Sequence, residues 1–220
     1  MPDIAVIFDL DGTLIDNNSF HIKAWQEFYK KRNRTLTEGE YKEHFNGKTN
    51  TDVLAYVFEQ PLSPQENEAY TNEKEDLYRV IYEPHIQPVK GLFKLLQQLQ
   101  NAKISMAIAT SGIKVNIDYM FNHLDIKHFF KEVIYSKDIK KGKPDPEIYF
   151  ITAQKLRVLP ENCIVFEDSV AGIQSAKAAG MKVVAIATTH TPAELTLADK
   201  LIYDYDEISI TDIDQLLKNK

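Results

Sequence analysis

The chain has 220 residues, 44% of them hydrophobic and 26% charged, a composition typical of a folded globular protein. Its formal net charge of −6, with no basic stripe interleaved with aromatic residues, argues against nucleic acid or an anionic membrane as a partner. The longest apolar stretches are strand-sized, far below the roughly 20 residues of a membrane span. The single cysteine, Cys163, excludes an intramolecular disulfide. The opening MPDIAVIF has neither a basic segment nor a small-residue cleavage site, so we expect a cytoplasmic protein.

The first apolar run, IAVIF at residues 4–8, is followed directly by Asp9 and Asp11, then Gly12 and Thr13. Five consecutive apolar residues predict a buried strand. Carboxylates beside a core are costly to desolvate unless something compensates them. These aspartates are therefore either turn residues that point outward or residues held for chemistry, and the rest of the chain has to decide between the two.

The next stretch, to about residue 87, shows helical periodicity and no comparable strand. In SFHIKAWQEFYKK the large apolar residues recur at helical spacing. TEGE and SPQE both match the capping-box pattern that begins a helix. We therefore expect a small all-helical domain over residues 16–87, with hinges near residues 15–18 and 84–90.

From Ala102 onward, strand-like apolar runs alternate with helical stretches. The runs are ISMAIAT (104–110), EVIYS (132–136), NCIVFEDS (162–169), KVVAIAT (182–188) and KLIYD (200–204). This alternation is typical of a parallel sheet with helices on both faces. The sequence therefore predicts an α/β fold in which residues 1–15 and 88–220 form a Rossmann-like parallel-sheet core.

Polar residues gather where these strands end, and that is where an open parallel sheet places its ligand site. They are Asp9, Asp11, Gly12 and Thr13 after the first run, Thr110, Ser111 and Gly112 after the second, Glu167, Asp168 and Ser169 after CIVF, and Lys143 in KKGKPDP. Clustered acids repel one another unless a cation lies among them. Oxygen ligands without a Cys or His cluster favour Mg²⁺ over zinc. A lysine and hydroxyl groups beside Mg²⁺ would form a cradle for a phosphoryl group.

Four segments, DLDGT, ATSG, GKPDP and FEDS, resemble the four motifs of the haloacid dehalogenase superfamily in order and spacing. The resemblance covers essentially the whole chain. The helical domain resembles the superfamily's cap of the first class, a layout shared by phosphoglycolate phosphatase-like and β-phosphoglucomutase-like members. The resemblance implies a haloacid dehalogenase-like core, a helical cap, Mg²⁺ as cofactor and a small phosphorylated metabolite as substrate, and it implies no protein partner.

The resemblance also implies the roles of the acids. Asp9 would be the nucleophile that forms an aspartyl-phosphate, and it would also bind the metal. Asp11 would act as general acid and base, with its backbone carbonyl on the metal. Asp168 would be a direct metal ligand, and Glu167 either a ligand or a partner of one.

The remaining motif residues would hold the phosphoryl group. Thr110, Ser111 and Gly112 would bind its oxygens, and Gly12 would let the backbone approach it closely. Lys143 would neutralise charge on the nucleophile and on the phosphoryl group.

In the cap, four residues are candidates for substrate binding. His21 resembles a histidine that couples cap closure to the catalytic acid in β-phosphoglucomutase-like proteins, or it is a locally satisfied histidine. The loop NGKTNTD (46–52) resembles the cap's substrate-facing loop, but Asn50 stands where those mutases have a phosphate-binding arginine. Lys48 either replaces that arginine or is solvated. Lys74 lies where the mutases have a substrate lysine, and its alternative is again a solvated side chain.

The group that attacks the phospho-aspartate separates two reactions. Water makes the protein a phosphatase, whereas a retained sugar hydroxyl makes it a mutase that must grip a second phosphate with bidentate cations. Asn50 argues against the mutase. We therefore predict a Mg²⁺-dependent phosphatase acting on a small phosphorylated metabolite, a sugar phosphate in particular. β-Phosphoglucomutase is the alternative, and a catalytically silent binding protein on the same fold comes third.

Overall fold

The computed structural model describes residues 4–45 and 48–218. The chain divides into two compact units, one of residues 1–16 with 87–220 and one of residues 17–86. Within the described part of the chain, no helix is both long enough and apolar enough to cross a membrane.

The larger unit is built on a sheet of six parallel strands in the order β3-β2-β1-β4-β5-β6. The strands are β1 (Ala5–Phe8), β2 (Ser105–Ala109), β3 (Glu132–Ile134), β4 (Cys163–Glu167), β5 (Lys182–Ile186) and β6 (Lys200–Ile202). Phe8, the last residue of β1, is in register with Ile108 of β2 and Phe166 of β4. The predicted parallel α/β sheet is confirmed, and the carboxyl ends of β1, β2 and β4 lie next to one another.

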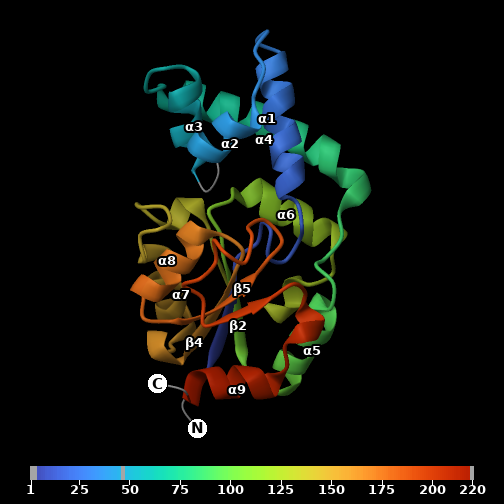
Figure 1. Ribbon diagram of the computed structural model, residues 1–220, viewed down its shortest axis with the longest axis vertical. Helices are drawn as coiled ribbons and strands as arrows, with labels where there is room; N and C mark the ends of the chain where they lie inside the picture. The colour runs from blue at the N-terminus through green and yellow to red at the C-terminus, as the bar shows by residue number, and fades with distance from the viewer. Residues whose placement is uncertain (1–3, 46–47, 219–220) are drawn as a thin grey trace. The chain divides into compact units, whose positions relative to one another are not determined.

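Helices cover both faces of this sheet. They are α5 (Leu92–Asn101), α6 (Lys114–His123), α7 (Glu147–Leu156), α8 (Val170–Ala178) and α9 (Ile210–Lys218). Because successive strand residues point to opposite faces, Ala5 and Ile7 of β1 share a core cluster with residues of α7 and α8. On the opposite face, Phe8 stacks on Phe166 with ring centroids 5.0 Å apart, and both rings contact Tyr205. In Figure 1, α7 and α8 lie on one side of the strands and α5 on the other.

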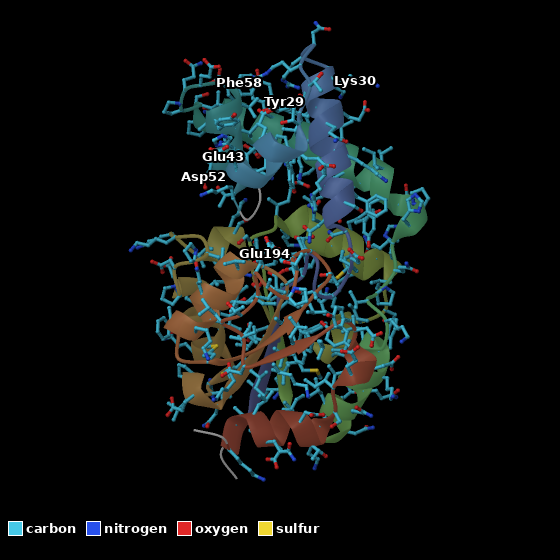
Figure 2. All side chains as sticks on the ribbon, viewed as in Figure 1. Tyr29, Lys30, Glu43, Asp52, Phe58 and Glu194 are labelled. Atoms are coloured by element: carbon cyan, nitrogen blue, oxygen red, sulfur yellow. The ribbon has the colours of Figure 1, made fainter. Side chains whose placement is uncertain are left out.

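The smaller unit contains four α-helices among its described residues: α1 (Asn18–Lys30), α2 (Glu38–His44), α3 (Asn50–Val57) and α4 (Pro64–Tyr82). As the sequence predicted, Thr37 caps α2 by accepting a hydrogen bond from the Glu40 amide, and Ser63 with Glu66 forms a capping box on α4. Tyr29, labelled in Figure 2, belongs to the unit's own buried cluster. That cluster consists of Trp25, Phe28, Tyr29, Leu36, Phe45, Val53, Leu54 and Val57.

The described residues also contain five short 3₁₀ helices. They are η1 (Glu83–His85), η2 (Lys127–Phe129), η3 (Ser136–Asp138), η4 (Pro160–Asn162) and η5 (Tyr205–Glu207).

The chain leaves and re-enters the larger unit at neighbouring points. Ile15 forms an isolated antiparallel bridge with Pro88. The Val89 amide donates a hydrogen bond to the Leu14 carbonyl at 3.0 Å. The helical unit is therefore an insertion whose two ends join the sheet unit side by side.

Candidate active site

Asp9 is the first residue beyond β1, and it is buried. Its amide donates to the Phe166 carbonyl at 3.0 Å, which extends the pairing of β1 with β4 by one residue. The chain then turns sharply at Gly12, whose φ of +75° lies in the left-handed region that favours glycine. The Gly12 amide donates to the Ile15 carbonyl at 2.8 Å, within the turn that follows the two aspartates.

Two further buried acids, Glu167 and Asp168, lie at the end of the neighbouring strand β4. Asp9, Glu167 and Asp168 each offer a carboxylate oxygen, and these oxygens all lie within 4.8 Å of one another. The cluster arises because β1 and β4 are paired in parallel and therefore end at the same edge of the sheet.

Lys143 comes from the segment that precedes α7, and its side chain is buried in the same place. Its Nζ donates to Asp9 Oδ1 at 2.6 Å and to Glu167 Oε1 at 2.5 Å. It also donates to the Ala109 carbonyl at 3.2 Å. One ammonium group therefore connects the carboxyl ends of β1, β2 and β4.

The acids of the cluster ionise differently because their surroundings differ. Burial, with the nearby Glu167 and Asp168 carboxylates, raises the pKa of Asp9 well above its usual value despite the opposing Lys143 ammonium. Burial and then the Glu167 charge raise the pKa of Asp168 to about 7. Burial acts in the same direction on Glu167, but Lys143 outweighs it and holds the pKa of Glu167 below its usual value.

This donor set fits a small divalent cation. Asp9 and Asp168 present carboxylate oxygens, the ligand type that hard cations such as Mg²⁺ prefer. The Lys143 ammonium balances one negative charge of a three-carboxylate cluster. A cation between Asp9 and Asp168 would offset the burial and, after it, the repulsion between carboxylates that raise the pKa values of both groups. Protein donors contact both oxygens of Glu167, the third acid of the cluster.

The predicted phosphoryl-binding residues lie beside Asp11. Thr110 is buried at the end of β2, and the Gly112 amide donates to its Oγ1 at 2.9 Å. A Cβ added to Gly112 would lie 3.4 Å from Asp11 Oδ2, so this loop and the Asp11 carboxylate adjoin. Ser111 lies between them and is partly exposed. The structure therefore brings the four sequence motifs to one edge of the sheet.

Two residues beside Asp168 had no predicted role: Thr13, which the sequence placed at the strand end without a task, and His190. Thr13 Oγ1 donates to Asp168 Oδ1 at 3.5 Å, and the Tyr205 hydroxyl donates to the Thr13 carbonyl at 3.0 Å. His190, which follows β5, donates from Nδ1 to the Asp168 carbonyl at 3.0 Å. The sequence signal for His190 was its place after a buried strand, which is the rule that identified the other motifs.

Tyr149 was also missed, because in the sequence it is one more aromatic residue on the apolar side of a helix. Its hydroxyl donates to Glu167 Oε1 at 2.7 Å. Burial raises the pKa of Tyr149 well above its usual value, so the hydroxyl keeps its proton and acts as a donor.

In the helical unit, three of the four predicted residues meet around Glu75. The Lys74 ammonium pairs with Glu75 Oε1 at 2.9 Å, and the side-chain amide of Asn50 donates from Nδ2 to the same oxygen at 2.7 Å. His21 Nδ1 lies 2.8 Å from Lys74 Nζ, and the His21 ring stacks on Tyr78 with centroids 3.9 Å apart. Lys74 is 2% exposed, so the alternative of a solvated lysine is wrong.

Lys48, the fourth predicted residue of this unit, is exposed. Its amide donates to the Phe45 carbonyl at 3.0 Å. Asn46 and Gly47 of the predicted substrate loop lie outside the described residues.

Comparison with known proteins shows the family to which this fold belongs. Residues 6–186 match the haloacid dehalogenase-like hydrolase family, to which the chain belongs. Over its full length the chain superimposes on a family IA hydrolase from Entamoeba histolytica with a TM-score of 0.91 and 34% identity, covering 100% of both chains. It also resembles β-phosphoglucomutase from Clostridium difficile, with a TM-score of 0.85, 25% identity and coverage of 98% and 97%.

Several curated relatives are named as phosphatases. Validoxylamine A 7'-phosphate phosphatase from Streptomyces hygroscopicus is 30% identical, over 93% of this chain and 95% of that protein. A phosphorylated carbohydrates phosphatase from Thermotoga maritima is 28% identical, over 81% of this chain and 82% of the Thermotoga protein. A chloroplastic 5-amino-6-(5-phospho-D-ribitylamino)uracil phosphatase from Arabidopsis thaliana is 28% identical over 97% of this chain, which spans 57% of that longer protein.

Proposed function

We propose that the protein is a Mg²⁺-dependent phosphatase that hydrolyses a small phosphorylated metabolite, a sugar phosphate in particular, through an aspartyl-phosphate on Asp9. The observation that carries the proposal is the buried contact between Lys143 Nζ and Asp9 Oδ1 at 2.6 Å, within a cluster of carboxylates at the end of the sheet. A nucleophilic carboxylate that has to approach an anionic phosphoryl group needs such a fixed positive charge beside it. The names of the curated relatives, one of them a phosphorylated carbohydrates phosphatase, support the same reaction and substrate class.

In the first step a carboxylate oxygen of Asp9 attacks phosphorus, and the bond from phosphorus to the substrate's ester oxygen breaks. Asp11 donates a proton to that oxygen as it leaves. Lys143 remains beside Asp9 and balances the charge of the phosphorylated carboxylate. Thr110, Ser111 and Gly112 hold the phosphoryl oxygens.

In the second step Asp11, now ionised, takes a proton from water. The water oxygen attacks phosphorus, the bond from phosphorus to the Asp9 oxygen breaks, and inorganic phosphate leaves. Both aspartates return to their starting protonation states, so the cycle consumes one water molecule and one phosphate monoester.

The cation's part follows from the donor set. When bound, Mg²⁺ would polarise the phosphoryl oxygens as a Lewis acid. The carboxylates of Asp9 and Asp168 and the backbone carbonyl of Asp11 would hold it.

β-Phosphoglucomutase remains the alternative, because the β-phosphoglucomutase from Clostridium difficile has the same fold. A mutase also has to hold a second phosphate, a task that needs free positive charge. We propose residues 16–87 as the cap, where Asn50 stands in place of the mutases' arginine and the Lys74 charge is balanced by Glu75 at 2.9 Å. These contacts favour the phosphatase.

The test is the release of inorganic phosphate from a panel of phosphometabolites, with and without Mg²⁺. The panel includes β-glucose 1-phosphate, together with fructose 1-phosphate and 6-phosphogluconate, the substrates named for two Escherichia coli relatives. Phosphate release that depends on Mg²⁺ is the expected outcome. Conversion of β-glucose 1-phosphate to glucose 6-phosphate without release would instead establish the mutase.

Substitution of the nucleophile tests the mechanism. We expect Asp9→Asn to lower phosphate release by about a thousandfold or more, because the side-chain amide cannot form the aspartyl-phosphate. Thermal unfolding should remain cooperative. Asp125→Asn is the matched control, since this carboxylate is fully exposed and its removal should change neither measurement. An active Asp9→Asn enzyme would show that another residue is the nucleophile.

A further inference from the structure

The Glu167 carboxylate receives four hydrogen bonds from the protein. Its Oε1 accepts from Lys143 Nζ at 2.5 Å and from the Tyr149 hydroxyl at 2.7 Å. Its Oε2 accepts from the Ser169 amide at 3.1 Å and from Ser169 Oγ at 2.9 Å. An ionised carboxylate has about four lone-pair positions, so these four donors occupy all of the positions at which Glu167 can accept a hydrogen bond. Glu167 is therefore held by its protein neighbours through both of its oxygens.

The Glu167 carboxylate lies directly against Gly172, where no larger residue would fit. A Cβ added to Gly172 would lie 1.9 Å from Glu167 Oε1 and 2.2 Å from Oε2, closer than any side chain can approach. Gly172 lies in the first turn of α8, where glycine is less favourable than alanine by up to about 1 kcal/mol. The helix therefore carries an unfavourable residue at the one place where the Glu167 side chain meets its backbone.

Tyr149 contacts both members of the Lys143–Glu167 pair. Its hydroxyl bonds to Glu167, and Lys143 Nζ lies 5.2 Å from the centroid of its ring, within the range of a cation–π contact. Tyr149 is fully buried on α7, which packs against β1, β2 and β3, so its ring has little freedom to move. Tyr149 thus constrains the Glu167 carboxylate through its hydroxyl group and the Lys143 ammonium through the face of its ring.

We infer that Tyr149 is a positioning residue that, through Glu167, holds the Lys143 ammonium against the Asp9 carboxylate. The inference rests on the proposed function, in which Asp9 accepts the phosphoryl group and Lys143 balances its charge. Loss of the hydroxyl frees one lone pair of Glu167 Oε1 and lets the carboxylate turn toward other donors. Lys143 then loses its alignment with Asp9, while the Asp9 and Asp168 oxygens keep their places.

The experiment compares Tyr149→Phe with Tyr29→Phe in the full chain. Tyr29 is a matched control, because it too is buried and its hydroxyl donates to a glutamate, Glu40 Oε1, at 2.8 Å. It lies on α1 in the helical unit, where Figure 2 labels it. Three quantities are measured: kcat and KM for p-nitrophenyl phosphate, the affinity for beryllium fluoride with Mg²⁺ present, and the Mg²⁺ affinity by calorimetry.

For Tyr149→Phe we expect kcat and beryllium fluoride affinity each to fall about tenfold, while KM and Mg²⁺ affinity change less than about twofold. Tyr29→Phe should lose comparable thermal stability and leave the other quantities unchanged. Equal effects of the two variants on kcat and beryllium fluoride would overturn the inference. So would a loss confined to Mg²⁺ affinity, since Glu167 would then act on the cation. A wild type that neither releases phosphate nor binds beryllium fluoride would instead overturn the proposed function, and the inference with it.

Discussion

At the scale of single residues, the two buried lysines Lys143 and Lys74 obtain their partners in different ways. Lys143 contacts the carboxylates of Asp9 and Glu167, which are far apart in the sequence, at 2.6 Å and 2.5 Å. Its sequence motif predicted the contact with Asp9 but not the one with Glu167. Lys74 pairs at 2.9 Å with the next residue in the chain, Glu75. Consecutive residues on a helix do not normally face each other, so sequence reasoning had no reason to expect this pair or its burial.

The Lys74–Glu75 pair should contribute strongly to the stability of the helical unit. Lys74→Met leaves a buried carboxylate without its ammonium, and we expect a loss of about 3 kcal/mol in the free energy of unfolding. The double variant Lys74→Met/Glu75→Gln should recover part of it, because no buried charge remains. Urea titrations measure both values.

An exposed ion pair of the same unit provides the control. Lys30 and Glu27 lie 3.4 Å apart with side chains 75% and 47% exposed, so Lys30→Met should cost less than about 0.5 kcal/mol. Equal losses for Lys30→Met and Lys74→Met would mean that burial of the Lys74–Glu75 pair does not determine its contribution.

At the scale of elements, α8 contains Gly172, a residue of low helix propensity, at the position where the Glu167 carboxylate lies against the helix. We expect Gly172→Ala to destabilise the protein by about 2 kcal/mol, because the added Cβ displaces the Glu167 carboxylate. Activity should fall with it. Gly39→Ala in α2 should have the opposite sign and gain up to about 1 kcal/mol, because a Cβ there meets nothing within 4 Å. Thermal unfolding of the two variants, compared with wild type, measures the contrast, and a stabilised Gly172→Ala would contradict it.

The first turn of α9 should make stability depend on pH. Hydrogen bonds from Lys200 and Ser209 lower the pKa of Asp212 to about 2. Because the folded-state pKa is lower than the unfolded one, this contribution is complete above the ordinary pKa of about 4 and is lost as pH falls toward 2. Asp212→Asn should therefore cost about 1 kcal/mol equally at pH 7 and pH 5, and less at pH 3. Urea titrations at the three pH values test this, and a gap that widens at pH 3 would contradict it.

At the scale of the whole molecule, the two units have separate buried clusters and adjacent connections. The Val89 amide lies 3.0 Å from the Leu14 carbonyl, so a short linker can join residue 16 to residue 87. We expect a chain with residues 17–86 replaced by a Gly-Ser linker to fold, with a cooperative thermal transition and Asp9-dependent binding of beryllium fluoride. Aggregation or a non-cooperative transition would show that the sheet unit needs the helical one.

The cytoplasmic location stays a prediction.

The sequence by itself determined the parallel α/β fold and the motifs of the candidate site. Runs of apolar residues predict the buried strands, and a parallel sheet brings the residues that follow its strands to one edge. The roles given to Asp9, Asp11, Thr110, Lys143 and Asp168 stay predictions until they are measured, but their positions around the strand ends could be anticipated. The helical stretch and its capping signals were equally legible, since they depend on local spacing.

Only the tertiary structure decided how the charges are paired. Tyr149 looks in the sequence like any aromatic residue on a helix, and its contact with Glu167 depends on the packing of α7 against the sheet. Gly172 signals only a weak helix position until the Glu167 carboxylate is seen against it. Lys74 reads as solvated until the fold buries it beside Glu75. Periodicity reports which face of an element is apolar, whereas the partner of a buried polar group depends on distances between elements far apart in the chain.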